Sequence, residues 1–227
     1  MVHGRRGTRR GVGMIIGTKT EFESLADFIL RDYLGNNYDC FTPLDIQAFA
    51  ETYLKLEISY FAFDPRENIE GMRTGNQIIL DQRLLDNSKI GERNFTIAHE
   101  CGHDLINWQD PSYVPQRVTN YRIKATHKVL KTEHDFKEWQ ANVVASCLLL
   151  RPNLVGWSMF TFMGKDKVTV FDNDHLYKKD RCQLRMMANF LGVSQTCLLY
   201  RLDCLDMTDR KPLEEYNPIY DIALSWR

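Results

Sequence analysis

The pentad His99-Glu100-Cys101-Gly102-His103 combines residue types and a spacing that can support metal chemistry. In a helix, residues four apart lie on one face, so His99 and His103 can reach one metal ion. Glu100 then lies about 100° around the helix, beside the metal rather than on it. A carboxylate in that place can take a proton from a metal-bound water, as a general base does. The pentad therefore predicts a metal site with a catalytic base.

The residues around the pentad predict a helix that is buried on nearly all sides. Its apolar members are Phe95, Ile97, Ala98, Cys101, Leu105 and Ile106. Buried polar groups must be paired, and a metal would pair them. The alternative is two core histidines hydrogen bonded to the backbone, with Glu100 at the surface. Glycine within a helix costs about 1 kcal/mol relative to alanine, so Gly102 predicts the close approach of another backbone.

A third metal ligand must come from another element, because catalytic zinc sites usually have three protein ligands and one open position. The best candidate is Glu138, since Asn142 follows one turn later and could accept the free ring N–H of a ligating histidine. Ala141 and Ala145 are small enough for this helix to lie close to the first. The alternative is that Glu138 is a solvated carboxylate at a helix start. Competing third ligands are His134, Glu133, Asp135 and Asp110.

The elements that must position these residues follow from the apolar pattern, which places strands in the first half of the chain and helices in the second. This order favours an α+β fold over a doubly wound sheet. Strands are expected over residues 56–63 and 77–81, with a turn bracketed by Gly71 and Gly75. Helices are expected over residues 21–34, 42–53 (capped by Thr42), 92–108, 135–150, 154–162, 175–191 and 194–205, with a short strand over 167–171. Residues 109–134 are polar and show no regular apolar pattern. An irregular segment of this length inside a domain is often functional.

The chain of 227 residues suits one domain, which we expect over residues 14–206. Residues 1–13 are rich in Arg and Gly and predict a disordered basic tail. Residues 207–227 contain two prolines and predict an irregular tail. Within the domain, residues 173–206 are predicted to be helical and to contain a helix-turn-helix-like pattern.

Composition narrows the classes of protein. The net charge of −1 gives no general attraction to nucleic acid or to anionic membranes. No apolar run approaches the roughly 20 residues that span a bilayer, so we expect no membrane partner. The six cysteines show no CxxC spacing and no secretory signal is recognisable, which predicts core cysteines and a cytoplasmic protein.

Three blocks of the sequence resemble the ImmA/IrrE family of metallopeptidases. The run R-N-F-T-I-A-H-E-C-G-H at residues 93–103 is similar to the family signature R-x-F-T-x-A-H-E-x-G-H. The run E-W-Q-A-N-V-V-A-S-C-L-L-L-R-P at residues 138–152 is similar to E-x-x-A-N-x-F-A-x-x-L-L-M-P, with Val144 in place of Phe and Arg151 added. Residues 188–202 resemble the family's ending more weakly. The resemblance covers roughly residues 40 to 206.

The resemblance implies a zincin-like core, in which a small mixed sheet accompanies the active-site helix and the C-terminal half is mostly helical. It implies one Zn²⁺ held by His99, His103 and Glu138, with Glu100 as the base of an endopeptidase. It also implies a bacterial cytoplasmic enzyme that cleaves a helix-turn-helix repressor or a similar regulator, often of a mobile element or phage.

Two features of such a site are less well defined by the sequence. The substrate backbone could pair with the strand that contains Gln77, Ile78 and Ile79. The group that stabilises the oxyanion is not identifiable. Candidates for it are His175, Tyr177, Tyr200 and Arg201, although each of them fits a structural or surface role better.

Two other functions remain open at this stage. A DNA-binding regulator would read DNA with residues 194–203, but these offer one arginine, Arg201, and an acidic end, whereas phosphate contacts require basic side chains. A non-proteolytic zinc domain would need no Glu100, and structural zinc sites usually have four protein ligands. A His/His/Glu site also suits manganese, cobalt or iron.

Overall fold

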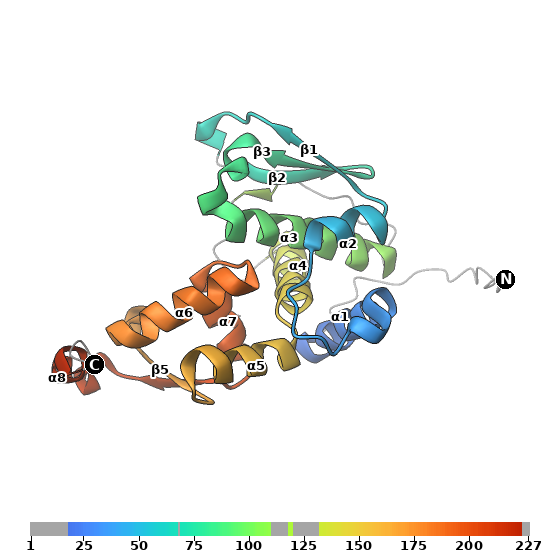
Figure 1. Ribbon diagram of the computed structural model, residues 1–227. Coiled ribbons are helices and arrows are strands. Elements are labelled where there is room, and N and C mark those ends of the chain that lie inside the picture. The colour runs from blue at the N-terminus through green and yellow to red at the C-terminus, as the bar shows by residue number, and fades with distance from the viewer. Residues whose placement is uncertain (1–17, 68, 110–117, 120–131, 224–227) are drawn as a thin grey trace.

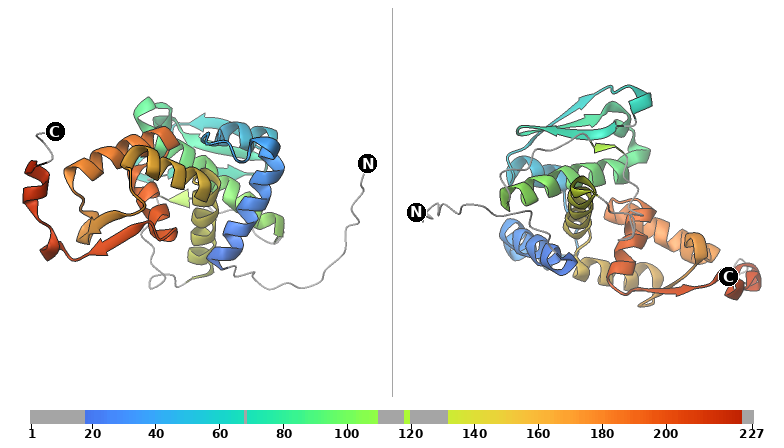
Figure 2. Two further views of the ribbon diagram at one scale, coloured as in Figure 1. Left: turned by 60° about the horizontal axis from the view of Figure 1, so that its bottom comes forward. Right: turned by 180° about the vertical axis from the view of Figure 1, so that it is seen from behind.

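A mixed four-stranded sheet lies along one side of the central helix α3, and α4 crosses the other side (Figure 1). The computed structural model describes residues 18–67, 69–109, 118–119 and 132–223. Seen from behind, α5, α6 and α7 lie on the side of α3 that faces away from the sheet (Figure 2). The predicted α+β class, with a small mixed sheet and a mostly helical second half, is confirmed. The helices and strands are α1 (Lys19–Leu34), α2 (Ile46–Thr52), β1 (Glu57–Phe61), β2 (Ile69–Thr74), β3 (Gln77–Asp81), α3 (Ile90–Gln109), β4 (Val118–Thr119), α4 (Glu133–Leu149), α5 (Pro152–Met163), β5 (Val168–Phe171), α6 (Lys178–Leu191), α7 (Gln195–Cys204), β6 (Thr208–Lys211) and α8 (Pro218–Ala223).

The sheet has the strand order β1-β3-β2-β4, with β1 parallel to β3 and β2 antiparallel to both of its neighbours. The sequence did not predict β2, because Gly71 was assigned to a turn. Gly71 instead lies inside the strand, where an added Cβ would come within 2.5 Å of Thr96 Cγ2 on α3. Glycine at this position lets the sheet pack directly on the helix. The turn itself is made by Gly75, whose φ of +58° favours glycine.

The predicted substrate-binding strand is wrong. Gln77, Ile78 and Ile79 of β3 pair with β1 along one edge and with β2 along the other. A strand that is hydrogen bonded on both edges has no free main-chain groups to offer a peptide. These three residues therefore belong to the centre of the described sheet.

Buried contacts join α4 to the helices around it. On one side Phe22 of α1 meets Trp139 of α4 edge to face, with ring centroids 6.3 Å apart. At the C-terminal end of α4, the buried Arg201 of α7 donates to the carbonyl of Leu150 and forms an ion pair with Glu23 of α1. Charged donors at a helix C-terminus satisfy carbonyls that have no partner within the helix. Arg201 thus ties three helices together.

Several predicted boundaries differ from the structure. The second helix begins at Ile46 rather than near Thr42, because Asp45 caps it by accepting from the N–H of Ala48. The helix expected from residue 175 begins at Lys178. The irregular tail expected after residue 206 contains β6, which pairs in parallel with β5, and the short helix α8.

Other sequence expectations have mixed outcomes. α6 ends at Gly192 in the left-handed conformation and α7 follows with Ser194 as its cap, as predicted for residues 173–206. All six cysteines are free; Cys101, Cys147 and Cys197 are buried, whereas Cys40 and Cys182 are exposed. The basic tail at residues 1–13 lies outside the described residues.

A membrane-spanning helix needs both sufficient length and a mostly apolar composition, and no single described helix combines them. Among the described helices, α4 and α5 taken together meet both requirements, but they are bent by 60° at their junction.

Candidate metal centre

Helices α3 and α4 touch backbone to backbone at Gly102. An added Cβ at this glycine would lie 2.8 Å from the carbonyl oxygen of Ala141 and 3.2 Å from its Cα. The predicted close approach at Gly102, with small residues on the facing helix, is confirmed. Because no side chain separates the helices here, residues one turn away on each helix can meet across the contact.

Three buried side chains meet beside this contact, and their ligand atoms all lie within 4.8 Å of one another. The Nε2 atoms of His99 and His103 are 2.9 Å apart. Glu138 of α4 reaches across, with Oε2 3.2 Å from His99 Nε2 and Oε1 3.3 Å from His103 Nε2. Each of the three residues is at most 2% exposed. This group could hold one metal ion.

The polar atoms of this cluster lack enough protein partners to account for their burial. Both carboxylate oxygens of Glu138 are buried and make no hydrogen bond of acceptable geometry, although they lie within ion-pair distance of the imidazoles. Buried oxygens without a donor cost about 1–3 kcal/mol each, and more when charged. A cation that accepts electron pairs from the two Nε2 atoms and the carboxylate would satisfy all three groups. The donor set therefore fits a metal ion.

Asn142 fixes the orientation of the first imidazole. Its Oδ1 lies 2.9 Å from His99 Nδ1, and an amide oxygen can only accept, so Nδ1 carries the proton and donates it. The lone pair of His99 is then on Nε2, which faces His103 and Glu138. The sequence predicted this contact, in which Asn142 accepts the free ring N–H of a metal-binding histidine.

Glu100 lies next to the cluster and is fully buried. Neither of its carboxylate oxygens has a hydrogen-bond partner in the described part of the chain. Burial raises the pKa of Glu100 to about 7, against the lowering influence of His99 and Arg73. A carboxyl group with a pKa near neutrality can both accept and release a proton, which is what general acid–base chemistry requires.

The three ligand candidates influence one another's ionisation. Burial and the neighbouring His99 lower the pKa of His103 to about 4, so that imidazole is neutral. Burial acts to raise the pKa of Glu138, but the close approach of the two imidazoles outweighs it and lowers the pKa to about 2. A neutral imidazole and an ionised carboxylate are the forms that bind metal.

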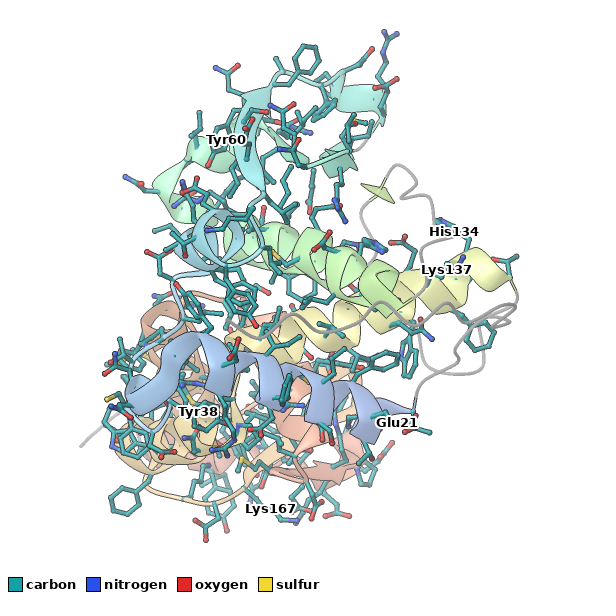
Figure 3. All side chains as sticks on the ribbon, turned by 90° about the vertical axis from the view of Figure 1, so that its right-hand side faces the viewer. Glu21, Tyr38, Tyr60, His134, Lys137 and Lys167 are labelled. Atoms are coloured by element: carbon teal, nitrogen blue, oxygen red, sulfur yellow. The ribbon has the colours of Figure 1, made fainter. Side chains whose placement is uncertain are left out.

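The two competing third ligands whose side chains the structure describes, His134 and Asp135, do not join the cluster. His134 lies one turn before Glu138, with Nδ1 3.8 Å from Glu138 Oε1, and its side chain is about one-third exposed. Figure 3 shows it near the N-terminal end of α4. Asp135 instead takes part in the helix cap, accepting from the N–H of Thr132. Asp110 and the side chain of Glu133 lie outside the described residues.

The predicted oxyanion candidates lie in other parts of the fold. His175 and Tyr177 pack against the ring of Tyr216 in a C-terminal aromatic cluster. Tyr200 is largely buried in α7, where burial raises its pKa, and Arg201 is occupied in the contact with α4 and α1. The structure does not bring any of these four residues to the His99, His103 and Glu138 group.

One charged residue near the site was not predicted. Arg73 of β2 forms an ion pair with Asp104, the residue that follows His103 on α3. The sequence carried no signal for it, because the strand that delivers Arg73 was itself not recognised.

Comparison with known proteins gives no assignment. The sequence matches no protein-family model and no curated protein. The functional interpretation therefore depends on the geometry of this chain and on the sequence resemblance described above.

Proposed function

We propose that this protein is a zinc-dependent metallopeptidase in which His99, His103 and Glu138 hold the metal and Glu100 is the general base. The observation that carries this proposal is the pair of buried, unpartnered carboxylate oxygens of Glu100 beside a three-ligand cluster. A site that served stability alone would gain nothing from a second buried carboxylate. In a metal site with three protein ligands and one open position, a metal-bound water can give that carboxylate a proton.

The chain's own residues divide the chemistry between them. A zinc ion in this site would lower the pKa of a bound water toward 7 and polarise the scissile carbonyl. Asn142 keeps His99 in the tautomer that presents Nε2. Glu100 takes the proton that the attacking water gives up and later delivers it to the leaving amine. All these groups are buried, which keeps water other than the attacking molecule out of the site.

The choice of zinc follows from the sequence resemblance, and the donor set is compatible with it. Two imidazoles and one carboxylate are a usual ligand set for catalytic zinc, and the same set also binds manganese, cobalt and iron. The substrate class follows from the sequence resemblance: a cytoplasmic regulatory protein, in particular a helix-turn-helix repressor of a mobile element or phage. Endopeptidase action on such a protein is part of the proposal.

The burial of α7 favours this proposal over a DNA-binding function. Of the ten residues of α7, only Thr196 and Asp203 are exposed. Its one arginine, Arg201, is 1% exposed and already paired with Glu23. A recognition helix must present polar and basic side chains to base edges and phosphates. This helix contributes to the core instead.

The direct test is the substitution Glu100→Gln. Glutamine has nearly the same shape but cannot accept a proton, so zinc content by elemental analysis should stay at the wild-type level while peptide cleavage falls by about 10²-fold or more. Cleavage is measured on a mixture-based fluorogenic peptide library. The matched control is Glu92→Gln, the same change at an exposed position of α3.

Two outcomes would contradict the proposal. Cleavage by Glu100→Gln at the wild-type rate would remove Glu100 from the base role. A wild-type protein that binds zinc but cleaves neither the library nor a helix-turn-helix repressor would favour the non-proteolytic zinc domain.

A further inference from the structure

Arg73 reaches the metal-binding helix from the sheet. Gly71 of β2 lies against Thr96 of α3, and two residues later Arg73 pairs with Asp104, so the strand and the helix run in the same direction. Arg73 Nε also donates to the carbonyl of Gly75, 3.0 Å away. The guanidinium is therefore held at two points, and only 10% of the side chain is exposed.

Among the residues that the structure describes, the third nitrogen of this guanidinium has no partner. Arg73 Nη1 is buried and makes no hydrogen bond, although each buried N–H of an arginine normally finds an acceptor. The ion pair with Asp104 and the bond to Gly75 already fix the side chain, so a purely structural role does not account for Nη1. A buried N–H of a rigidly held guanidinium is suited to donate a hydrogen bond to a bound ligand.

This donor lies on the same side of α3 as the proposed base. Glu100 and Asp104 are four residues apart and share one helix face. Asp104 directly follows His103 on α3, so its ion pair holds the charge of Arg73 next to a proposed ligand and one helical turn from the proposed base. Arg73 is thus within electrostatic range of the base and of one ligand.

We propose that Arg73 is a substrate-binding residue of this site, and that its Nη1–H donates to a main-chain carbonyl oxygen of the bound peptide beside the scissile bond. This inference rests on the proposed peptidase function and deepens it. It assigns a role to a residue of β2, where the sequence had placed substrate binding on β3.

A carbonyl fits this position better than a terminal carboxylate. Asp104 already balances the charge of Arg73, and Glu100 is close by. A substrate carboxylate would bring another negative charge into a buried place that holds two acidic side chains, and like charges in low dielectric repel strongly. A neutral carbonyl oxygen accepts the hydrogen bond without that repulsion. The site therefore suits the interior of a peptide and an endopeptidase.

The test uses two hydroxamates and the zinc-loaded full-length protein. Acetohydroxamate binds through the metal alone, whereas a succinyl hydroxamate that carries a leucyl-alanine amide adds main-chain carbonyls. Calorimetry gives the affinity of each. The variants are Arg73→Lys, which keeps the charge but loses the fork, and Arg83→Lys, a matched control that alters a comparable ion pair with Asp81.

We expect the wild-type protein to bind the peptidyl hydroxamate more tightly than acetohydroxamate. Arg73→Lys should reduce this preference by about tenfold or more, as the loss of a charge-assisted hydrogen bond predicts. Its zinc content and its affinity for acetohydroxamate should stay unchanged, and Arg83→Lys should behave like wild type.

An equal preference in wild type and Arg73→Lys would overturn the inference, as would the absence of any preference in the wild type. If Arg73→Lys loses its fold, the double variant Arg73→Gln/Asp104→Asn removes the charged donor without leaving a buried carboxylate alone. Failure of the proposed function gives a different result. The wild-type protein would then either bind neither zinc nor acetohydroxamate, or bind zinc and cleave neither the peptide library nor a helix-turn-helix repressor.

Discussion

Asn142 decides which nitrogen of His99 faces the metal, so it should govern metal affinity without binding the metal. The substitution Asn142→Ala removes the acceptor for His99 Nδ1–H and frees the ring to rotate. We expect metal affinity to fall by about 10–100-fold, measured by competition with a chromophoric chelator. Asn153→Ala on α5 is the control, because its side chain accepts only from the neighbouring N–H of Leu154. Equal affinities in Asn142→Ala and wild type would show that the tautomer is set elsewhere.

Glu138 and His134 provide a second contrast between neighbouring residues. Glu138 belongs to the ligand cluster, whereas His134 lies 3.8 Å from it and is partly exposed. Glu138→Ala should therefore lose zinc after dialysis and His134→Ala should retain it, as elemental analysis can determine. Full zinc occupancy in Glu138→Ala would move the third ligand elsewhere, with His134 next in line.

At the level of elements, the site depends on how closely α3 and α4 approach. The substitution Gly102→Ala places a methyl group 2.8 Å from the carbonyl of Ala141 and forces the helices apart. We expect a loss of about 1–3 kcal/mol of stability from overpacking, together with a loss of metal affinity. Urea unfolding of the metal-free protein measures the first, and chelator competition measures the second.

Gly91→Ala is the matched control for this substitution. Its Cβ would also meet backbone, 2.5 Å from the carbonyl carbon of Val193, but at the start of α3 and far along the helix from the ligands. It should lower stability and leave the metal affinity of the folded protein unchanged. Metal affinity that falls equally in both variants would mean that general loss of stability, rather than helix spacing, weakens the site.

The elements also show what the sequence could and could not predict. The pentad spacing is local to one helix, so the positions of His99 and His103 followed from helix periodicity alone. Glu138 and Asn142 became candidates because small residues beside them indicated close packing, and the resemblance of residues 138–152 to a family motif selected Glu138 as the ligand. β2 was missed because the glycine that lets it pack on α3 also interrupts its strand pattern. Arg73 was missed with it, since its approach to Asp104 depends on a contact that no local pattern records.

The pairing of β5 with β6 escaped prediction for a different reason. β6 has the sequence Thr-Asp-Arg-Lys and two exposed residues, so it lacks the apolar alternation of a half-buried strand. It forms because its backbone pairs in parallel with Val168–Phe171, some 40 positions earlier in the chain. Such pairing is set by the packing of the intervening helices and not by the strand's own side chains.

For the molecule as a whole, a bound metal would connect two helices that belong to different parts of the core. α3 lies next to the sheet, and α4 packs on α1 and is held at its end by Arg201 of α7. Because the ligands come from both helices, an ion that binds the folded chain should stabilise the entire fold.

Zinc at a concentration 100 times its dissociation constant should contribute about 2.7 kcal/mol, which corresponds to a rise in Tm of roughly 5–10 °C for a domain of this size. Thermal unfolding with zinc and with a chelator measures this shift. Glu100→Gln should show the full shift and Glu138→Ala should show none. A wild-type Tm that does not respond to zinc would mean that the ion does not bridge α3 and α4.

The contact between Gly102 and Ala141 has a consequence for evolution. Position 102 has no room for any side chain, so purifying selection there should be as strict as at the ligands themselves, although glycine does no chemistry. In descendants of this gene, a serine or alanine at that column would separate the two helices and weaken metal binding even where both histidines and both glutamates survive.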